Sequence, residues 1–470
     1  MALALRRNQN SYFARLTLLK KLFWLYFLLL IFEGALRKWV APQLSAPLLV
    51  IRDPVSILII WEAYRTRKWP TRWSLLITVL AMVFLGLFSL QTALGDSPFL
   101  VGLYGLRSYL LPFPVIFIMG ENLDDEDLLN LGRCTLWLLL PICLLAVGQY
   151  LAPADSFLNR GAYTGAKQIG YIGEGVRASG TFSLAIGLVQ FATLAGIFIF
   201  YGMVRENLAK KWLIWASTFA LIVTVPTTGQ RTLVVQLAAV LVCIAISAMM
   251  GISQFTKVIR VVIPVVILFG LASFLPVFKD AMQSMGDRFT MGAAAEGGTE
   301  QSSFYDRTIT PATSAIEAAI DTPNKLGVGL GRGAMAVEVF MTGYTQFVTG
   351  EYEFSRELME MGPFVGGAFA LFKLFLAILI FVQAFACARD RHPLALLLYP
   401  LVFGTLFYGV LEQPTEQGFV VISVALCIAA AKQRVKVVVP LSGSLLRQRQ
   451  ALLALQRRQQ AWQQRRIQRS

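Results

Sequence analysis

The longest polar stretch of this sequence, residues 279–360, carries the residue types best suited to chemistry. It contains six basic side chains and twelve carboxylates, and long apolar segments flank it on both sides. Near its end, Glu351 and Glu353 stand beside Arg356. A carboxylate can act as a general base, and an arginine can hold an anion through two parallel hydrogen bonds. The same residues are equally typical of an acidic first helical turn, so both interpretations stay open.

A glycine-rich run at residues 327–333 lies within this stretch and includes Arg332. It resembles a dinucleotide-binding fingerprint only superficially, because no strand is predicted in front of it. The favoured interpretation is a close-packed loop whose backbone approaches a bulky or anionic group. Upstream, Thr310 and Pro311 precede apolar residues at helical spacing, which predicts a short amphipathic helix that ends at Asp321.

The composition is that of a membrane protein. Of the 470 residues, 56% are hydrophobic and 15% are charged, whereas a soluble domain averages about 25% charged residues. Apolar runs of 18 or more residues, separated by short charged loops, predict an all-α polytopic membrane protein with about twelve transmembrane helices. The predicted spans lie near residues 17–36, 46–63, 74–94, 107–120, 134–152, 182–203, 212–226, 232–250, 258–278, 361–385, 394–411 and 417–432.

Positive charge is concentrated at the two ends of the chain. The formal net charge is +15, and residues 432–470 hold ten basic residues and no acid, while residues 1–21 hold five more. This distribution follows the positive-inside rule, so we expect both termini in the cytoplasm and the 279–360 loop outside the plasma membrane. Attraction to anionic lipid is a secondary effect, and nucleic-acid binding is not expected.

Four parts of the chain follow from this topology. Residues 1–278 are expected to form nine transmembrane helices, and residues 279–360 an extracytoplasmic loop with short amphipathic helices. Residues 361–432 are expected to form three further transmembrane helices. Residues 433–470 form a basic cytoplasmic tail, for which a helix on the membrane surface is the favoured structure and partner binding the alternative.

Ionisable residues in or beside the predicted spans gather in the outer half of the membrane. Such residues are costly to insert and often mark function, although pairing between helices is the simpler explanation for any single one. Their common depth predicts a site at the outer surface. They are Glu33, Arg37, Lys38, Arg52, Asp53, Arg107, Arg177, Arg231, Glu412 and Glu416.

Histidine chemistry is excluded from the outer side. The single histidine, His392, falls in a predicted inside loop, so neither a Ser-His-Asp triad nor a histidine metal site can form outside. The five cysteines fall in or beside predicted membrane helices and show no disulfide or metal-type spacing. We therefore expect a site with no metal and no cofactor.

The order of these features resembles the O-antigen polymerase and O-antigen ligase superfamily of bacterial cell-surface polysaccharide assembly. Residues 105–110 (GLRSYL) precede a proline-containing span, and residues 177–182 (RASGTF) open the sixth span. Residues 227–232 (TTGQRT) resemble the family's Ser/Thr-rich segment that ends in arginine. The resemblance covers about residues 100–430.

The long loop carries the most telling part of the resemblance. Asp306 and Arg307, a short helix, Pro323, the glycine run, an acidic-aromatic stretch and residues 360–366 (EMGPFVG) follow in the family's order. One departure concerns residues 351–353 (EYE), which stand where ligases of the family carry histidine. This departure favours a polymerase over a ligase.

The resemblance implies a GT-C-like, metal-independent glycosyltransferase. It would polymerise undecaprenyl-diphosphate-linked oligosaccharide repeat units into O-antigen or exopolysaccharide on the outer side of the bacterial plasma membrane. An acceptor hydroxyl would attack the anomeric carbon, with Glu353 or Glu351 as the base, and arginines would stabilise the departing lipid diphosphate. The candidates for this diphosphate clamp are Arg231, Arg307, Arg332, Arg177, Arg107 and Arg356.

The resemblance also implies partners and leaves two alternatives. Donor and acceptor are both lipid-linked glycans in the bilayer, and a chain-length regulator and a flippase of the same pathway are expected partners. One alternative is ligase-type transfer of a glycan to a lipid or protein acceptor. The other is a transporter or flippase of lipid-linked sugars, which would place polar residues near the midplane and use paired broken helices. The sequence shows no internal repeat, which counts against a transporter.

Overall fold

The fold is all-α in the part of the chain that the computed structural model describes. That part comprises residue 12, residues 16–162, 171–172, 175–205, 208–249, 324–334, 353–389 and 392–432, and isolated residues between 270 and 317. The chain divides into two units, Met1–Lys432 and Gln433–Ser470. The basic tail and most of the predicted 279–360 loop lie outside the described residues, although Thr313, Ser314, Ile316 and Glu317, within the predicted amphipathic helix, are helical.

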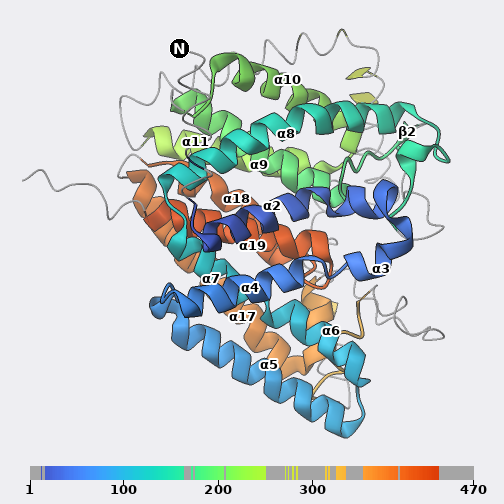
Figure 1. The fold of residues 1–470 in the computed structure, drawn as a ribbon, viewed down its shortest axis with the longest axis vertical. Helices are drawn as coiled ribbons and strands as arrows, with labels where there is room; N and C mark the ends of the chain where they lie inside the picture. Colours follow the sequence, from blue (N-terminus) through green and yellow to red (C-terminus); the bar gives the residue numbers. More distant parts are fainter. Residues whose placement is uncertain are drawn as a thin grey trace, which may run out of the picture. The chain divides into compact units, whose positions relative to one another are not determined.

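Figure 1 shows the helices of the first unit and their order along the chain. Two-residue strands, β1 (Tyr171–Ile172) and β2 (Gly175–Val176), form one antiparallel pair. The helices are α2 (Leu18–Ala35), η1 (Leu36–Val40), η2 (Pro42–Leu44), α3 (Ser45–Leu48), α4 (Arg52–Arg65), η3 (Thr71–Trp73), α5 (Ser74–Leu94), α6 (Phe99–Leu110), α7 (Pro112–Asn122), α8 (Asp125–Leu151), η4 (Phe157–Asn159), α9 (Ala185–Val204), α10 (Lys211–Thr228), α11 (Arg231–Met249), α17 (Glu353–Arg389), α18 (Leu394–Tyr408) and α19 (Pro414–Lys432).

Eight helical stretches of the described residues are long and apolar enough to cross a membrane. The predicted class, an all-α membrane protein, is therefore confirmed, while the number of spans stays a prediction. One predicted span, 107–120, belongs to a longer helical stretch, Phe99–Asn122, which α6 and α7 form together. The predicted span 258–278 lies almost wholly outside the described residues.

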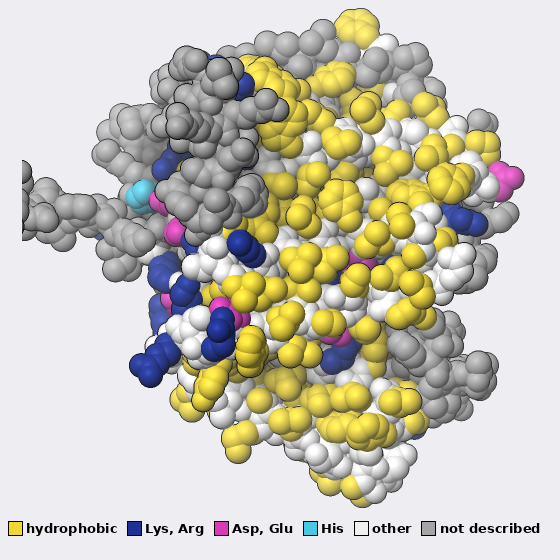
Figure 2. All heavy atoms as spheres, in the orientation of Figure 1, with side chains coloured by type: hydrophobic (Ala, Val, Ile, Leu, Met, Phe, Trp, Pro, Cys, Tyr) yellow, Lys and Arg dark blue, Asp and Glu magenta, His cyan; other side chains and the backbone are white. Residues whose placement is uncertain are grey.

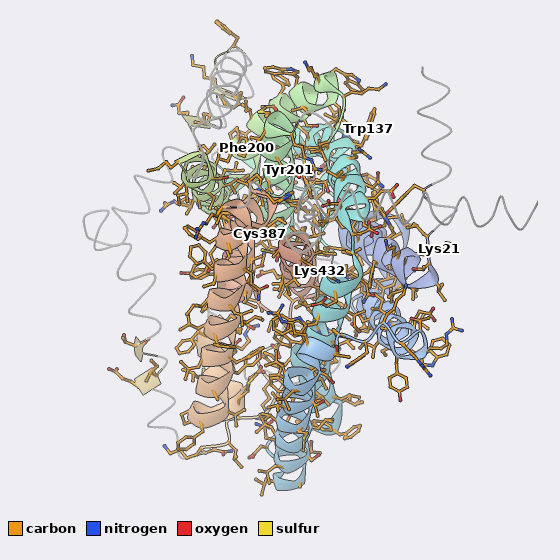
Figure 3. All side chains as sticks on the ribbon, turned by 90° about the vertical axis from the view of Figure 1, so that its left-hand side faces the viewer. Lys21, Trp137, Phe200, Tyr201, Cys387 and Lys432 are labelled. Carbon is orange, nitrogen blue, oxygen red and sulfur yellow. The ribbon has the colours of Figure 1, made fainter. Side chains whose placement is uncertain are left out.

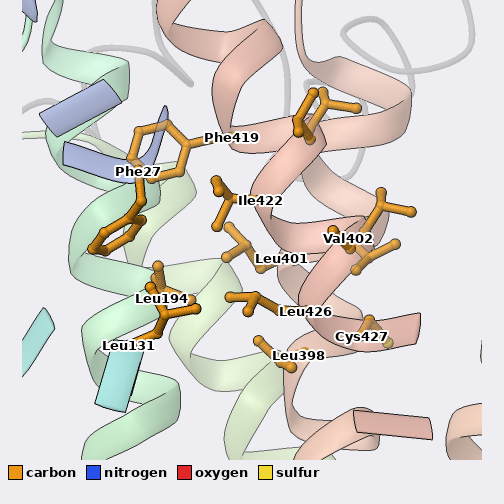
Figure 4. Close-up of a cluster of buried hydrophobic side chains, with 14 of the residues drawn as sticks. Phe27, Leu131, Leu194, Leu398, Leu401, Val402, Phe419, Ile422, Leu426 and Cys427 are labelled. Carbon is orange, nitrogen blue, oxygen red and sulfur yellow. The ribbon is translucent and has the colours of Figure 1, made fainter. Parts of the chain in front are cut away.

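Helix α19 forms the centre of the first unit. Its residues 414–431 are all buried, and it packs against α7, α18, α17 and α9. An apolar residue on every side of a helix is typical of one enclosed by other helices. Figure 4 shows Phe419 and Ile422 of α19 in a cluster of buried side chains that includes Phe27 of α2 and Leu194 of α9.

Ion pairs join three charged helix ends in the first unit. Lys20 pairs with Asp124 at 2.6 Å, and Lys432 pairs with Glu121 at 3.1 Å. Figure 2 shows Lys and Arg side chains gathered on the left, beside a wide hydrophobic face. Figure 3 looks onto this end, with Lys432 and Lys21 labelled. These contacts bring together the start of α2, the end of α7 and the end of α19.

Helix α17 is broken at Gly362, which has φ 73° and ψ 170° and precedes Pro363. The Lys373 ammonium forms an ion pair with the Glu357 carboxylate, although sixteen residues separate them. A straight helix would place these residues about 24 Å apart along its axis. Residues 353–361 are therefore a half-helix that folds back onto the rest of α17. A side chain at Gly366 would collide with the Glu357 carbonyl, which confirms this close approach.

Candidate functional site

The half-helix at residues 353–361 presents its charged residues on one face. Glu353, Arg356, Glu357 and Glu360 follow at helical spacing i, i+3, i+4 and i+7, and the three carboxylates are at most 2% exposed. They meet side chains from α6, the rest of α17, the connection between α18 and α19, and the first turn of α19. We call the whole group the acid cluster: Glu353, Arg356, Glu357, Glu360, Lys373, Tyr109, Glu412 and Glu416.

The glycine run holds the carboxylate of Glu360. One carboxylate oxygen accepts hydrogen bonds from the Gly331 amide and the Tyr109 hydroxyl, each at 3.1 Å, and the other accepts one from the Gly333 amide at 2.6 Å. Backbone amides in such a concave turn are suited to an anion. The anionic group predicted to approach the run is thus the protein's own carboxylate.

Gln91 of α5 fixes the glycine run against the break in α17. Its side-chain nitrogen donates to the carbonyls of Leu326 and Glu360, at 2.7 and 2.8 Å, and its oxygen accepts from the Leu330 amide at 2.9 Å. The run also contacts α6 so closely that a Cβ atom on Gly105 would lie 2.3 Å from the Gly331 nitrogen. Residues 324–334 are therefore part of the helical core.

The turn between α18 and α19 closes the acid cluster from the other side. The Leu411 amide donates to Glu353 at 3.1 Å, and the Glu412 carboxylate lies 3.5 Å from the Arg356 guanidinium. Neither carboxylate oxygen of Glu412 accepts a hydrogen bond from a described residue. Burial, followed by the charge of Glu360, raises the pKa of Glu412 well above 4.5. Glu412 therefore holds its proton more tightly than an exposed glutamate does.

The acid cluster contains more carboxyl groups than cations. Five glutamates share this buried region with two cations, Arg356 and Lys373, and each glutamate is at most 8% exposed. Unpaired buried carboxylates are costly when ionised, so part of the cluster must hold protons. A site of this kind can accept and donate protons beside a bound substrate.

A second buried group lies where α2, η1 and α4 meet, and we call it the cationic cluster: Glu33, Arg37, Lys38 and Arg52. The Glu33 carboxylate bridges the Arg37 and Arg52 guanidinium groups, at 3.4 and 3.2 Å. All four side chains are at most 3% exposed. Arg52 also donates to the carbonyl of Pro414, so the turn between α18 and α19 lies between the two clusters.

Lys38 has no carboxylate partner within the described part of the chain. Its ammonium donates to the Ser179 hydroxyl and, at 3.4 Å, to the Gly180 carbonyl. Gln149 fixes this segment, because its side-chain oxygen accepts from the Ser179 and Gly180 amides at 3.0 and 2.8 Å. Burial, with a smaller contribution from Arg37, lowers the pKa of Lys38 to about 7.

Three of the predicted clamp residues lie around the acid cluster. Arg107 of α6 pairs with Asp53 at 2.6 Å and covers the Tyr104 ring. Arg356 faces Glu412, and Arg332 is partly buried between the two glycines that bind Glu360. The predicted base Glu353 is buried in the same region.

The other predicted residues lie elsewhere. Arg177 and Arg231 are both partly buried. They flank a contact in which the Ala178 amide donates to the Thr227 carbonyl at 3.2 Å, just before α11 begins. Glu351 and Arg307 lie outside the described residues.

Six residues of these clusters were predicted at the outer surface but without a chemical role: Glu33, Arg37, Lys38, Arg52, Glu412 and Glu416. Five further residues of the site were given no role by the sequence: Gln91, Tyr109, Glu357, Glu360 and Lys373. For the half-helix a sequence signal existed, since four charged residues at helical spacing mark one face. For Gln91 and Tyr109 no local signal distinguishes them from ordinary helix residues.

Within the described residues, no group of three or more histidine, cysteine, aspartate or glutamate side chains is arranged to hold a metal ion. The expectation of a site without a cofactor stays a prediction. Comparison with protein-family models, with curated proteins and with solved structures found no match to this chain.

Proposed function

We propose that this chain is a metal-independent membrane glycosyltransferase that polymerises undecaprenyl-diphosphate-linked repeat units into cell-surface polysaccharide. The observation that carries the proposal is the assembly around Glu360. Residues 105–110, the glycine run and residues 360–366, far apart in sequence, meet there through Gly105, Gly331 and Tyr109. These are the motifs on which the resemblance to O-antigen polymerases and ligases rests.

The acid cluster supplies the proton chemistry in this proposal. The acceptor hydroxyl attacks the anomeric carbon of the donor, the new C–O bond forms, and the bond to the lipid diphosphate breaks. The hydroxyl proton passes to a carboxylate, for which Glu353 is the candidate in the described residues and Glu351 the candidate outside them. A single displacement of this kind inverts the anomeric centre. Nearby glutamates favour proton uptake, because they raise the affinity of the cluster for protons.

Arginines stabilise the departing lipid diphosphate in this proposal. Arg332 is the best-placed candidate, because it is partly exposed and lies in the glycine run. Arg107 pairs with Asp53 and Arg356 faces Glu412, so acidic side chains position both arginines. Arg177, Arg231 and Arg307 remain candidates on neighbouring segments. Preorganised positive charge of this kind is usually the largest catalytic contribution.

The arrangement of charges supports action at the outer side of the bacterial plasma membrane. Lys20 and Lys432 lie at the joined ends of α2, α7 and α19, and the acid cluster lies where α17 begins and α18 ends. By the positive-inside rule, the basic end faces the cytoplasm. The substrates are then lipid-linked glycans in the outer leaflet, and a chain-length regulator and a flippase are the expected partners.

A transporter or flippase of lipid-linked sugars is the second candidate, and one observation favours it. Helix α17 is broken, and its apolar half carries Lys373 in a buried ion pair with Glu357. Broken helices with buried charges are typical of secondary transporters. In the polymerase proposal, the same break serves to hold the half-helix against the glycine run.

Polysaccharide from cells that lack this protein tests these candidates. The cells are complemented with wild type, Glu353→Gln or Arg332→Gln at equal membrane abundance, and chain length is measured by gel electrophoresis. The proposal expects long chains with wild type and single lipid-linked repeats with the variants. Long polymer that fails to reach its final acceptor would identify a ligase. Lipid-linked repeats trapped on the cytoplasmic side would identify a flippase and refute the proposal.

A further inference from the structure

The carboxyl groups of Glu360 and Glu412 lie within hydrogen-bonding reach of each other, although they belong to different elements. Glu360 lies near the end of the half-helix, and Glu412 lies in the turn between α18 and α19. Both side chains are at most 3% exposed. A carboxylate has no hydrogen to donate, so this contact becomes a hydrogen bond only when one of the two groups carries a proton. Two buried carboxylates this close are strongly unfavourable when both are ionised.

The other hydrogen bonds of the pair distinguish the two carboxyl groups. Glu360 accepts three hydrogen bonds, from two backbone amides and the Tyr109 hydroxyl, and such donors stabilise the ionised form. Neither carboxyl oxygen of Glu412 has a hydrogen-bond partner among the described residues. This difference favours Glu412 as the group that carries the proton and Glu360 as the group that accepts the hydrogen bond.

Arg356 provides the charge that balances the pair. A Cβ atom on Gly333 would lie 2.8 Å from a Glu360 carboxylate oxygen and 2.9 Å from the Arg356 Cγ atom, so these two side chains lie together over the glycine. The Arg356 guanidinium lies 3.5 Å from Glu412. One cation beside two carboxyl groups leaves the site neutral when the pair holds one proton.

The elements around Glu412 present few other titratable groups to it. Glu353, Arg356 and Glu360 face it from the half-helix, and Tyr109 faces it from α6. Lys373 pairs instead with Glu357, and Glu416 accepts a hydrogen bond from the Val410 amide. The state of Glu412 is therefore determined mainly by Glu360 and Arg356.

We propose that Glu360 and Glu412 share one proton, and that this proton fastens the turn at residues 409–413 to the half-helix. With the proton bound, the carboxyl group of Glu412 donates to the Glu360 carboxylate. Without it, two negative charges face each other and the turn loosens. The Leu411 amide of the same turn binds Glu353 at 3.1 Å, so the shared proton also holds the carboxylate proposed as the base. The inference concerns the turn and applies to a polymerase and a transporter alike.

Amide hydrogen exchange of the full chain in lipid nanodiscs measures how firmly the turn is held. Wild type and Glu412→Gln are compared at the same pH, so that the intrinsic exchange rate cancels. The glutamine keeps a permanent donor toward Glu360. We expect the amides of residues 409–413 to exchange equally in both proteins at pH 5. At pH 9 they should exchange at least about tenfold faster in wild type, because a hydrogen bond to a charged group is lost.

A second turn of the chain provides the internal control. The Asn159 side chain donates to the carbonyls of Gln149, Ala152 and Pro153, so a side-chain amide holds the turn at residues 152–159. The amides of this turn should exchange alike in both proteins at either pH. Glu412→Met has no donor, so residues 409–413 of this variant should exchange fast at pH 5 as well.

Infrared spectroscopy tests whether the proton is shared. Glu412→Gln should remove a protonated carboxyl band from the wild-type spectrum at neutral pH. Glu360→Gln should remove the same band, because Glu412 then ionises beside Arg356. A band that survives Glu360→Gln would mean that burial alone protonates Glu412, and it would overturn the sharing.

Two results of the exchange experiment would overturn the inference. One is equal exchange of residues 409–413 in wild type and Glu412→Gln at pH 9, which would mean that the proton does not fasten the turn. The other is exchange that follows the sodium concentration at constant pH and ionic strength. That result would place a metal cation, and not a proton, between the two carboxyl groups.

Discussion

Replacement of Glu360 by glutamine tests whether the glycine run is held by a buried carboxylate. The wild-type side chain accepts three hydrogen bonds, from Gly331, Gly333 and Tyr109. In Glu360→Gln, one oxygen is replaced by an NH₂ group that faces a backbone amide, so two donors oppose each other. The size of the side chain is unchanged, so packing contributes little to the difference.

The magnitude follows from the bonds that are lost. A hydrogen bond to a charged group contributes about 1.5–3 kcal/mol, and an unsatisfied buried donor costs about 1–3 kcal/mol. Relief from burying a charge offsets part of this loss. We expect Glu360→Gln to lower the free energy of unfolding by about 3 kcal/mol. Tyr109→Phe removes one donor only and should cost about 1.5 kcal/mol.

Equilibrium unfolding in mixed micelles measures these free energies, and trypsin cleavage after Arg332 reports release of the glycine run. Glu62→Gln is the matched control, because Glu62 is also buried but pairs with the largely exposed Arg65. Such a pair contributes about 1 kcal/mol or less. A cost for Glu360→Gln no larger than that of Tyr109→Phe, with unchanged cleavage, would refute the account of the glycine run.

Three further predictions follow from the same geometry. The pKa of Glu412 is raised in the folded state, so its contribution to stability is complete below pH 4.5 and is lost as the pH rises toward the folded-state value. Glu412→Gln should therefore melt at a higher temperature than wild type at pH 8 but not at pH 4. An equal difference in melting temperature at both pH values would contradict this. Lys373→Met leaves Glu357 buried and unpaired and should cost about 3–5 kcal/mol in chemical unfolding, most of which a second change, Glu357→Gln, should restore. Gly331→Ala should lower the free energy of unfolding by about 2 kcal/mol or more, because φ is +81° and a Cβ atom would meet the backbone of α6. The control is Gly367→Ala, whose Cβ atom meets nothing within 4 Å, and it should be neutral or slightly stabilising. Equal melting temperatures for the two variants would refute the close contact.

Hydropathy and charge in the sequence were enough to predict the membrane class and most helices. Apolar runs must be helical where water is absent, because every backbone group then has its partner within the helix. The predicted spans 74–94 and 212–226 accordingly fall on α5 and α10. The glycine run also predicted a close backbone approach, because glycine is the residue that tolerates positive φ.

Only the tertiary structure decided what these residues meet. The sequence did not indicate that the anion beside the glycine run is Glu360, because Glu360 lies 27 and 29 residues beyond the two glycines that bind it, on a half-helix that ends in a break at Gly362. It also did not indicate that Lys38 would lack a carboxylate partner while Lys373 has one. Neither lysine has an acidic residue within four positions in the sequence. Their difference arises from packing, since the helices that surround each lysine determine which counter-ion lies within reach.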